Sequence, residues 1–183
     1  MGDAADPFAS LAALEDHVWA VLAAGARREG PARFVALATA SGRAGPQVRM
    51  VALRGADRGA GTLEMASDVR TAKVRALKDD PRAEVMVWDD VAQVQIRVAL
   101  DVEQVRADPD RWARLPDPGR LNYGTDPAPG VPVERPADVS REGRIDRFVA
   151  LVGRVRRIDV VSLAHEPHRR ARLAPGGATW TAP

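Results

Sequence analysis

The chain has 183 residues, and its 27 Lys and Arg residues nearly balance 25 Asp and Glu residues, giving a formal net charge of +2. This length is typical of one domain and is sufficient to bury a hydrophobic core, so we expect a single domain over residues 1–183. Because the sequence contains no cysteine, it can form no disulfide, no thiolate metal site and no cysteine nucleophile, and we expect no bound metal.

Composition also argues against membrane and nucleic-acid partners. The acidic stretch Met1–Asp6 is not followed by a signal-type apolar run, and no segment approaches the apolar length of a membrane span. Arginines are scattered among acidic residues, and aromatic residues, at 4%, are too sparse to form a base-stacking platform. We therefore expect no nucleic acid and no membrane, and a cytoplasmic location, which the absence of cysteine fits.

The first predicted element is an amphipathic helix over Pro7–Ala24, within an N-terminal region of residues 1–30. Asp6 can cap this helix ahead of Pro7, and Gly25–Pro31 interrupts the pattern. His17 within it is expected to be a surface or packing residue. The apolar residues at helical spacing are Phe8, Leu11, Leu14, Val18, Val21 and Leu22.

A hairpin is predicted next, with strands at Arg33–Thr39 and Gln47–Arg54 and a turn at Ser41-Gly42. Side chains alternate along a strand, so Arg49 and Arg54 are expected on opposite faces of the second strand. The Gly-rich turn that follows, Gly55–Gly61, lacks the spacing of a phosphate-binding motif.

The following strand and helix meet at a polar junction. Leu63–Ser67 reads as a strand and Asp68–Lys78 as a short helix that ends before Pro81. The first N–H groups of a helix lack partners and favour an anion, and added basic side chains increase selectivity for phosphate. The expected buried stripe of this helix is Val69, Ala72, Ala76 and Leu77, and the polar residues at the junction are Ser67, Asp68, Arg70, Thr71 and Lys73.

Further strands complete a mainly β pattern. Ala83–Trp88 is largely apolar, and after the turn at Asp89-Asp90 the segment Val94–Val102 alternates strictly, with Gln95 and Arg97 on its polar face. Additional strands are predicted at Arg147–Val152, Val155–Leu163 and Arg169–Leu173, the last of which closes the barrel.

The intervening region, residues 106–144, is the least regular. It contains one short predicted helix at Asp108–Leu115 and is otherwise rich in Pro and Gly. A loop of this length within a compact domain is typical of a lid, a dimer-contacting arm or a disordered segment.

Four blocks in this order, RMVALR, SDVRTAKV, a DP turn followed by VW, and QVQIRV, resemble the FMN-binding split β-barrel of the pyridoxamine 5′-phosphate oxidase superfamily. The segment FVALATASGRAGPQVR resembles the opening hairpin of that family, and HRRARLAP resembles its closing strand. The similarity covers roughly residues 32–174. It implies a mainly β barrel with flanking α-helices and a homodimer that holds each FMN between protomers.

The resemblance also implies a set of cofactor-binding residues. Ser67 and Lys73 correspond to the positions that contact the phosphate and ribityl chain of FMN, with Arg70 and Thr71 as helpers. Gln95 corresponds to a residue that hydrogen-bonds the flavin ring, a task for which an amide offers both donor and acceptor. The remaining members of the expected FMN site are Arg49, Arg54 and the backbone of Met50, Val51 and Ala52.

The resemblance defines the substrate less closely than it defines the cofactor. Arg120 and Tyr123 are the expected substrate-binding residues. The true oxidase has a late Trp and an Arg-Leu-His element that this sequence lacks in register. His168-Arg169-Arg170 is only superficially similar, and Trp180 lies too near the end of the chain.

Three functional hypotheses follow. The first is a flavin oxidoreductase that transfers hydride between FMN and a small organic substrate, with no catalytic residue identified. The second is a binding module that holds FMN, F420 or haem without turnover, where a haem ligand would have to be His17, His165 or His168. The third, a basic nucleic-acid-binding barrel, is disfavoured by the scattered charge.

Overall fold

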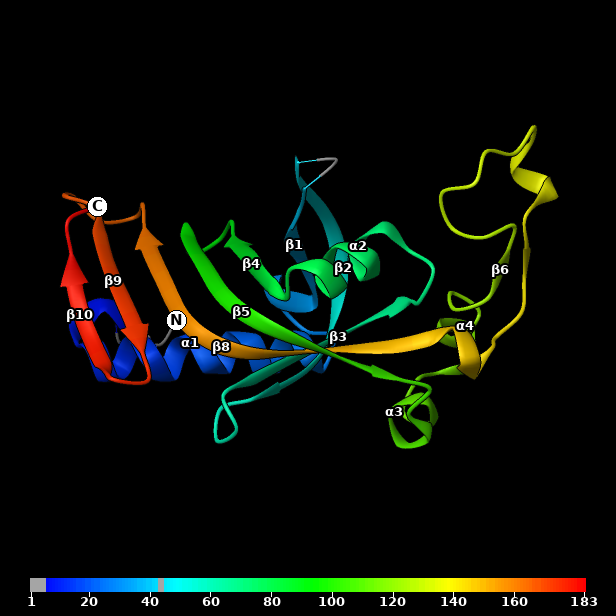
Figure 1. Cartoon of the computed structure of the whole chain (residues 1–183). Coiled ribbons are helices and arrows are strands. Elements are labelled where there is room, and N and C mark those ends of the chain that lie inside the picture. Colours follow the sequence, from blue (N-terminus) through cyan, green and yellow to red (C-terminus); the bar gives the residue numbers. More distant parts are fainter. Residues whose placement is uncertain (1–5, 43–44) are drawn as a thin grey trace.

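The computed structural model describes residues 6–42 and 45–183, so most of the acidic stretch Met1–Asp6 lies outside the described residues. Strands dominate the fold, and helices lie beside them (Figure 1). The helices are α1 (Leu11–Ala26), α2 (Ala72–Asp79), α3 (Pro109–Ala113) and α4 (Asp117–Arg120), with 3-10 turns η1 (Pro7–Ala9), η2 (Pro31–Arg33), η3 (Pro136–Asp138) and η4 (Ile145–Arg147). The strands are β1 (Phe34–Ser41), β2 (Gly45–Asp57), β3 (Thr62–Asp68), β4 (Arg82–Asp89), β5 (Val94–Arg106), β6 (Thr125–Asp126), β7 (Ser140–Arg141), β8 (Phe148–Ser162), β9 (Arg169–Ala174) and β10 (Gly177–Thr181).

Six antiparallel strands close into a barrel in the order β8-β3-β2-β1-β4-β5, with β5 pairing back onto β8. The closing pair is long, running from Val94 opposite Ser162 to Arg106 opposite Val149. The prediction that Arg169–Leu173 closes the barrel is therefore wrong. Because β5 already occupies one edge of β8, β9 and β10 extend outward from the same strand, at the left of Figure 1.

Alternation along the strands places the core inside the barrel. On β5 the residues Val94, Ile96, Val98 and Leu100 are all buried, as their spacing predicted, and Gln95 and Arg97 are half-buried on the other face. The predicted fold class, a mainly β barrel with flanking α-helices, is confirmed.

Helix α1 packs its apolar side against the strands, burying Leu14, Val18 and Leu22. The predicted helix, Pro7–Ala24, differs from the observed α1, Leu11–Ala26, at both ends. Ser10 starts α1 because its side chain accepts a hydrogen bond from the Ala13 N–H, and the helix continues through Gly25 to Ala26. A side chain at Gly25 would overlap Ala32, so glycine permits this close approach. In the described ranges, no helix has the length and apolar character needed to cross a membrane.

Helix α2 is shorter than predicted. Asp68 belongs to β3, and a turn through Arg70 and Thr71 precedes the helix at Ala72. Its buried residues are Val74, Ala76 and Leu77, whereas Ala72 is exposed. The expected stripe was therefore partly wrong, because the helix starts later than the sequence pattern indicated.

Two further predictions are corrected by strand β8. The two strands expected at Arg147–Val152 and Val155–Leu163 form one continuous strand. Its pairing with β5 shifts register between Ala99 and Leu100, as at a β-bulge. The irregular region before it contains α3, α4 and the small β6–β7 pair, and it projects from the barrel at the right of Figure 1. A second apolar cluster anchors it, formed by Leu115, Tyr123, Phe148 and Ala150.

Candidate functional site

The barrel opens between β2 and β3. Along β2, pairing with β1 extends from Ala52 to Gly45, whereas pairing with β3 covers only Leu53 to Asp57. Beyond Met65, β3 continues its pairing with β8 as far as Asp68 and diverges from β2. The backbone of residues 50–52 therefore borders an opening on the β3 side, where its polar groups have no strand partner among the described pairings.

A cluster of hydroxyl groups lies beside this opening. Ser67 Oγ and Thr71 Oγ1 are 2.9 Å apart, and the Lys73 ammonium donates to Ser67 Oγ at 3.0 Å. Thr71 Oγ1 also donates to the Asp68 carbonyl at 2.9 Å, which fixes the turn between β3 and α2. The structure therefore brings together three of the predicted phosphate-site residues, Ser67, Thr71 and Lys73.

Arg49 reaches the same neighbourhood from β2. Its Nη1 donates to Thr39 Oγ1 at 2.8 Å and to the Leu37 carbonyl at 3.2 Å, and its Nη2 donates to Gln47 Oε1 at 3.3 Å. Thr39 is buried and was not predicted as a site residue. Its place opposite Gln47 in the hairpin register was the signal that could have identified it.

The electrostatics of the cluster favour an anion. Burial lowers the pKa of Lys73, the charge of Arg49 lowers that pKa further, and the charge of Asp68 opposes the shift. Burial also lowers the pKa of Arg49. Neither cation forms an ion pair with a carboxylate in the described part of the chain. Two partly buried, mutually repelling cations beside hydroxyl donors would gain stability from a bound dianion.

The Arg70 side chain binds partners outside this cluster. Its guanidinium binds both carboxylate oxygens of buried Asp68, through Nε at 3.0 Å and Nη2 at 2.7 Å. The same Nη2 donates to the Thr125 carbonyl at 2.8 Å. In this arrangement Arg70 connects β3 to the projecting segment instead of joining Arg49 and Lys73.

Arg54 is separated from Arg49, as the strand alternation predicted. It hydrogen-bonds the Tyr123 hydroxyl, and its charge opposes the rise that burial causes in the Tyr123 pKa. Tyr123 is only 5% exposed and packs edge-on against Phe148 and Trp112. The tyrosine proposed from sequence for substrate binding therefore anchors the projecting segment to the barrel.

The other predicted substrate residue, Arg120, serves the same segment. Its guanidinium donates to the carbonyls of Trp112 and Ala113, at 3.2 Å and 3.1 Å, and pairs with Asp117 at 2.9 Å. These contacts connect α4 to α3, so Arg120 and Tyr123 contribute to one local packing arrangement.

Gln95 lies on the outer face of β5, between Trp88 on β4 and Val161 on β8. It is half-buried, and its amide forms no side-chain hydrogen bond within residues 6–42 and 45–183. An amide in this position is available to a ligand lying over the outer face of the sheet.

The histidines do not gather at this site. His165 is engaged by Ser162 Oγ at 2.8 Å and by Asp6 Oδ2 at 3.3 Å, near the connection from β8 to β9. His168 lies in the same connection and His17 lies on α1. Over the described ranges, no group of three or more His, Asp or Glu side chains could hold a metal ion.

The class of protein follows from these features: a split β-barrel with a cluster of hydroxyls and two cations beside the opening. Residues 16–104 match the family described as pyridoxamine 5′-phosphate oxidase, FMN-binding domain, and all four sequence blocks fall within that segment. The predicted resemblance to the FMN-binding split barrel of the pyridoxamine 5′-phosphate oxidase superfamily is thus confirmed. None of the curated protein sequences matches this one.

Solved structures share the whole fold. A pyridoxamine 5′-phosphate oxidase-related, FMN-binding protein from Nostoc punctiforme is 24% identical, with a TM-score of 0.77 over 95% of this chain and 100% of that chain. PhzG from Burkholderia lata, solved with tetrahydrophenazine-1-carboxylic acid, is 19% identical, with a TM-score of 0.74 over 97% of this chain and 95% of that one. At these identities, the likeness establishes the fold.

Proposed function

We propose that this protein binds FMN non-covalently and is an FMN-dependent oxidoreductase acting on a small organic substrate. The observation that carries the proposal is a group of hydroxyls and two cations that have no carboxylate partner in the described chain. Lys73 donates to the Ser67 hydroxyl, which also contacts the Thr71 hydroxyl, and Arg49 lies near enough for its charge to lower the pKa of Lys73. This donor set fits a phosphate dianion, which is the terminal group of FMN.

The position of the cluster supports a flavin over a free phosphate. It lies beside the opening between β2 and β3, where the backbone of Met50, Val51 and Ala52 pairs with β1 but has no strand partner on the β3 side among the described residues. Polar groups of that backbone and the Gln95 amide are of the kind that can hydrogen-bond the mixed donor and acceptor edge of an isoalloxazine ring. We assign Arg54 and Arg70 supporting roles at the ends of the site, because each already holds a protein partner.

Bound FMN would supply the hydride chemistry itself. The task of the chain's own residues is to hold and orient it: Arg49 and Lys73 fix the phosphate end, and the β2 backbone and Gln95 fix the ring end. No acid–base pair is assigned among these residues.

We also propose that the protein is a homodimer that covers the flavin. Neighbouring strands β1, β2 and β4 present an apolar outer face. On it, Phe34 is 51% exposed, Val48 70%, Met50 62% and Trp88 38%. A contiguous apolar surface of this kind is typical of a protein interface. Because Met50 also borders the opening, a second copy on this face would enclose the site.

The test is FMN titration of the purified protein, followed by absorbance and calorimetry. We expect saturable binding that weakens at least about tenfold in Lys73→Ala and in Arg49→Ala, the loss typical of a charge-assisted hydrogen bond. Lys78→Ala is the matched control, because Lys78 is exposed on the same helix. Absence of FMN binding, or equal losses in Lys78→Ala, would refute the cofactor assignment.

A second candidate function is a cofactor-binding module without turnover. Spectra of the same purified protein distinguish it from an FMN-dependent enzyme. A Soret band or an F420 spectrum in the purified protein would favour that module. If FMN binds, anaerobic reduction of the flavin by candidate substrates, beginning with pyridoxamine 5′-phosphate, distinguishes an enzyme from a carrier.

A further inference from the structure

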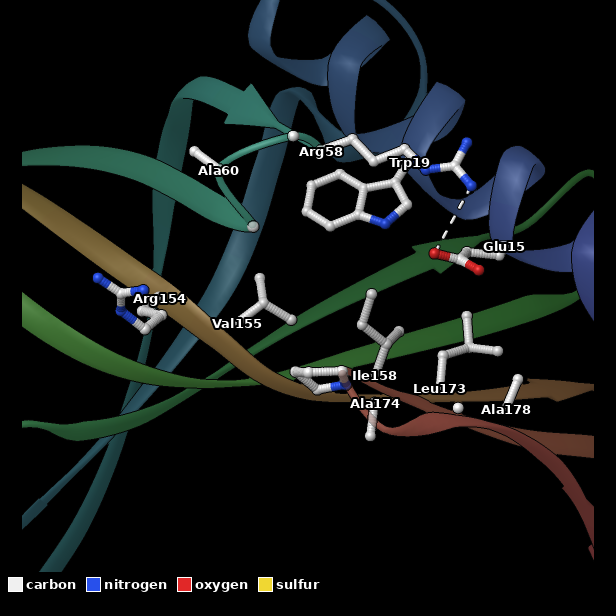
Figure 2. A pocket seen from close by; sticks show the side chains of 14 residues that line it. Glu15, Trp19, Arg58, Ala60, Arg154, Val155, Ile158, Leu173, Ala174 and Ala178 are labelled. Atoms are coloured by element: carbon white, nitrogen blue, oxygen red, sulfur yellow. Dashed lines mark ion pairs between the residues drawn. The ribbon is translucent and has the colours of Figure 1, made fainter.

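We propose a second small-molecule site, separate from the flavin site, that takes an aromatic monocarboxylate. The site is a cavity of about 490 Å³ between α1, the β2–β3 turn, β8 and the β9–β10 turn (Figure 2). Cavities of this size are typical of small-molecule sites. The inference rests on the walls and charges of this cavity and is independent of the proposed FMN chemistry.

The cavity lies away from the proposed phosphate site at Ser67, Thr71 and Lys73. It is lined by Arg58 to Gly61, which precede the first residue of β3, whereas Ser67 lies near the last residue of that strand. At about 3.4 Å per residue, the two ends of β3 are roughly 20 Å apart. The cavity is therefore not part of the cluster of Ser67, Thr71 and Lys73, and none of these three residues lines it.

The walls favour a flat apolar body. Trp19 of α1 projects its indole toward the floor formed by Val155, Ile158 and Leu173 (Figure 2). Trp19, Ile158 and Leu173 belong to the main hydrophobic core and are each at most 8% exposed, so this side of the cavity is an apolar wall made by the core. A planar ring packed against the indole and the branched aliphatic side chains would remove its own apolar surface from water.

The polar groups favour a single negative charge on the ligand. The indole N–H of Trp19 donates no hydrogen bond within the described residues and is not among their fully buried unpaired polar atoms, so it is accessible to a ligand in the cavity. At the rim, Arg58 is already neutralised by Glu15 and Asp16. Arg154 is exposed and forms no ion pair in the described parts of the chain, so it supplies the one uncompensated charge at the rim. One free guanidinium and one N–H donor match a carboxylate better than a dianion.

The probe for this site is 2-naphthoate, titrated by calorimetry into the full-length protein with and without saturating FMN. We expect one saturable site per chain, with the same affinity in both conditions. Arg154→Gln should weaken binding about tenfold, the effect of losing one charge-assisted hydrogen bond. Arg157→Gln is the matched control, because Arg157 is exposed on the same strand but does not line the cavity, and it should bind like the wild type.

Three results would overturn the proposal: no saturable binding, competition between 2-naphthoate and FMN, or equal affinities of the wild type and Arg154→Gln. Equal binding of the neutral analogue 2-naphthalenemethanol would overturn the assignment to a carboxylate. Because FMN affinity is measured in the same protein, failure of this site is distinguishable from failure of the flavin site.

Discussion

The Lys73 ammonium donates a 3.0 Å hydrogen bond to Ser67 Oγ, which joins helix α2 to the end of strand β3 by a direct side-chain contact. Ser67 is buried, and Arg49 adds a second positive charge from β2. The lysine is therefore held in a place where its charge is disfavoured in the free protein and would be favoured by a bound phosphate.

This relationship predicts a pH dependence of FMN binding. The pKa of Lys73 lies below its ordinary value of 10.5 in the free protein, and a bound phosphate would raise it. Binding should therefore take up a proton, and affinity should fall as pH rises from neutral toward 10.5. Dissociation constants measured from pH 7 upward should show this trend in the wild type and a flatter one in Lys73→Arg, whose guanidinium stays charged. A slope unchanged in Lys73→Arg would assign the effect to another group.

Arg70→Ala should lower stability more than it lowers FMN affinity. The substitution leaves the Asp68 carboxylate, 3% exposed, without the guanidinium that binds both of its oxygens. Loss of a charged hydrogen-bond partner at a buried group costs about 1–3 kcal/mol. Denaturant unfolding and FMN titration of the same variant measure the two effects. A large loss of affinity with unchanged stability would instead place Arg70 on the phosphate.

Val48→Asp should weaken the proposed dimer. Val48 is 70% exposed on the outer face of β2, and a carboxylate there would be desolvated in an apolar interface. Light scattering over a concentration series should show the variant shifted toward monomer. Val91→Asp, at a residue 96% exposed in the β4–β5 turn, should keep the wild-type mass. A wild type that is monomeric at all concentrations would contradict the interface.

Tyr123→Phe should affect folding more than catalysis. The change removes the hydroxyl that Arg54 hydrogen-bonds and leaves the ring packed on Phe148. We expect a loss of about 1 kcal/mol in the free energy of unfolding. The Michaelis constant for any substrate identified should stay within about twofold of the wild type, a change of under 1 kcal/mol. A KM raised tenfold without loss of stability would restore Tyr123 to the substrate site.

Local pattern predicted much of the fold. Strict alternation identified the buried face of β5, and the same alternation correctly separated Arg49 from Arg54 on β2. Prediction from local pattern failed where the extent of an element depends on pairing with a distant strand. Helix α2 starts at Ala72 because Asp68 is still part of β3 and pairs with Phe148 of β8. The two strands expected around Gly153 are one strand because β5 pairs along both parts.

The residues of the candidate site were likewise predicted from sequence only in part. The order of the four blocks identified the superfamily, and the junction of Ser67, Thr71 and Lys73 was visible because these residues are close in sequence. Thr39 was not visible, because it meets Arg49 only through the register of the hairpin. Arg70 and Tyr123 carried the right chemistry for a ligand, but neighbours distant in sequence already engage them.

Sequence alone thus determined the strand periodicity, the absence of cysteine chemistry and the family resemblance, because each depends on residue type and spacing along the chain. Tertiary structure alone decided which strands close the barrel, which arginines remain free of carboxylates and where a cavity opens beside Trp19. Those properties depend on contacts between distant segments, and a charge or an indole N–H is available to a ligand only where folding has left it without a partner.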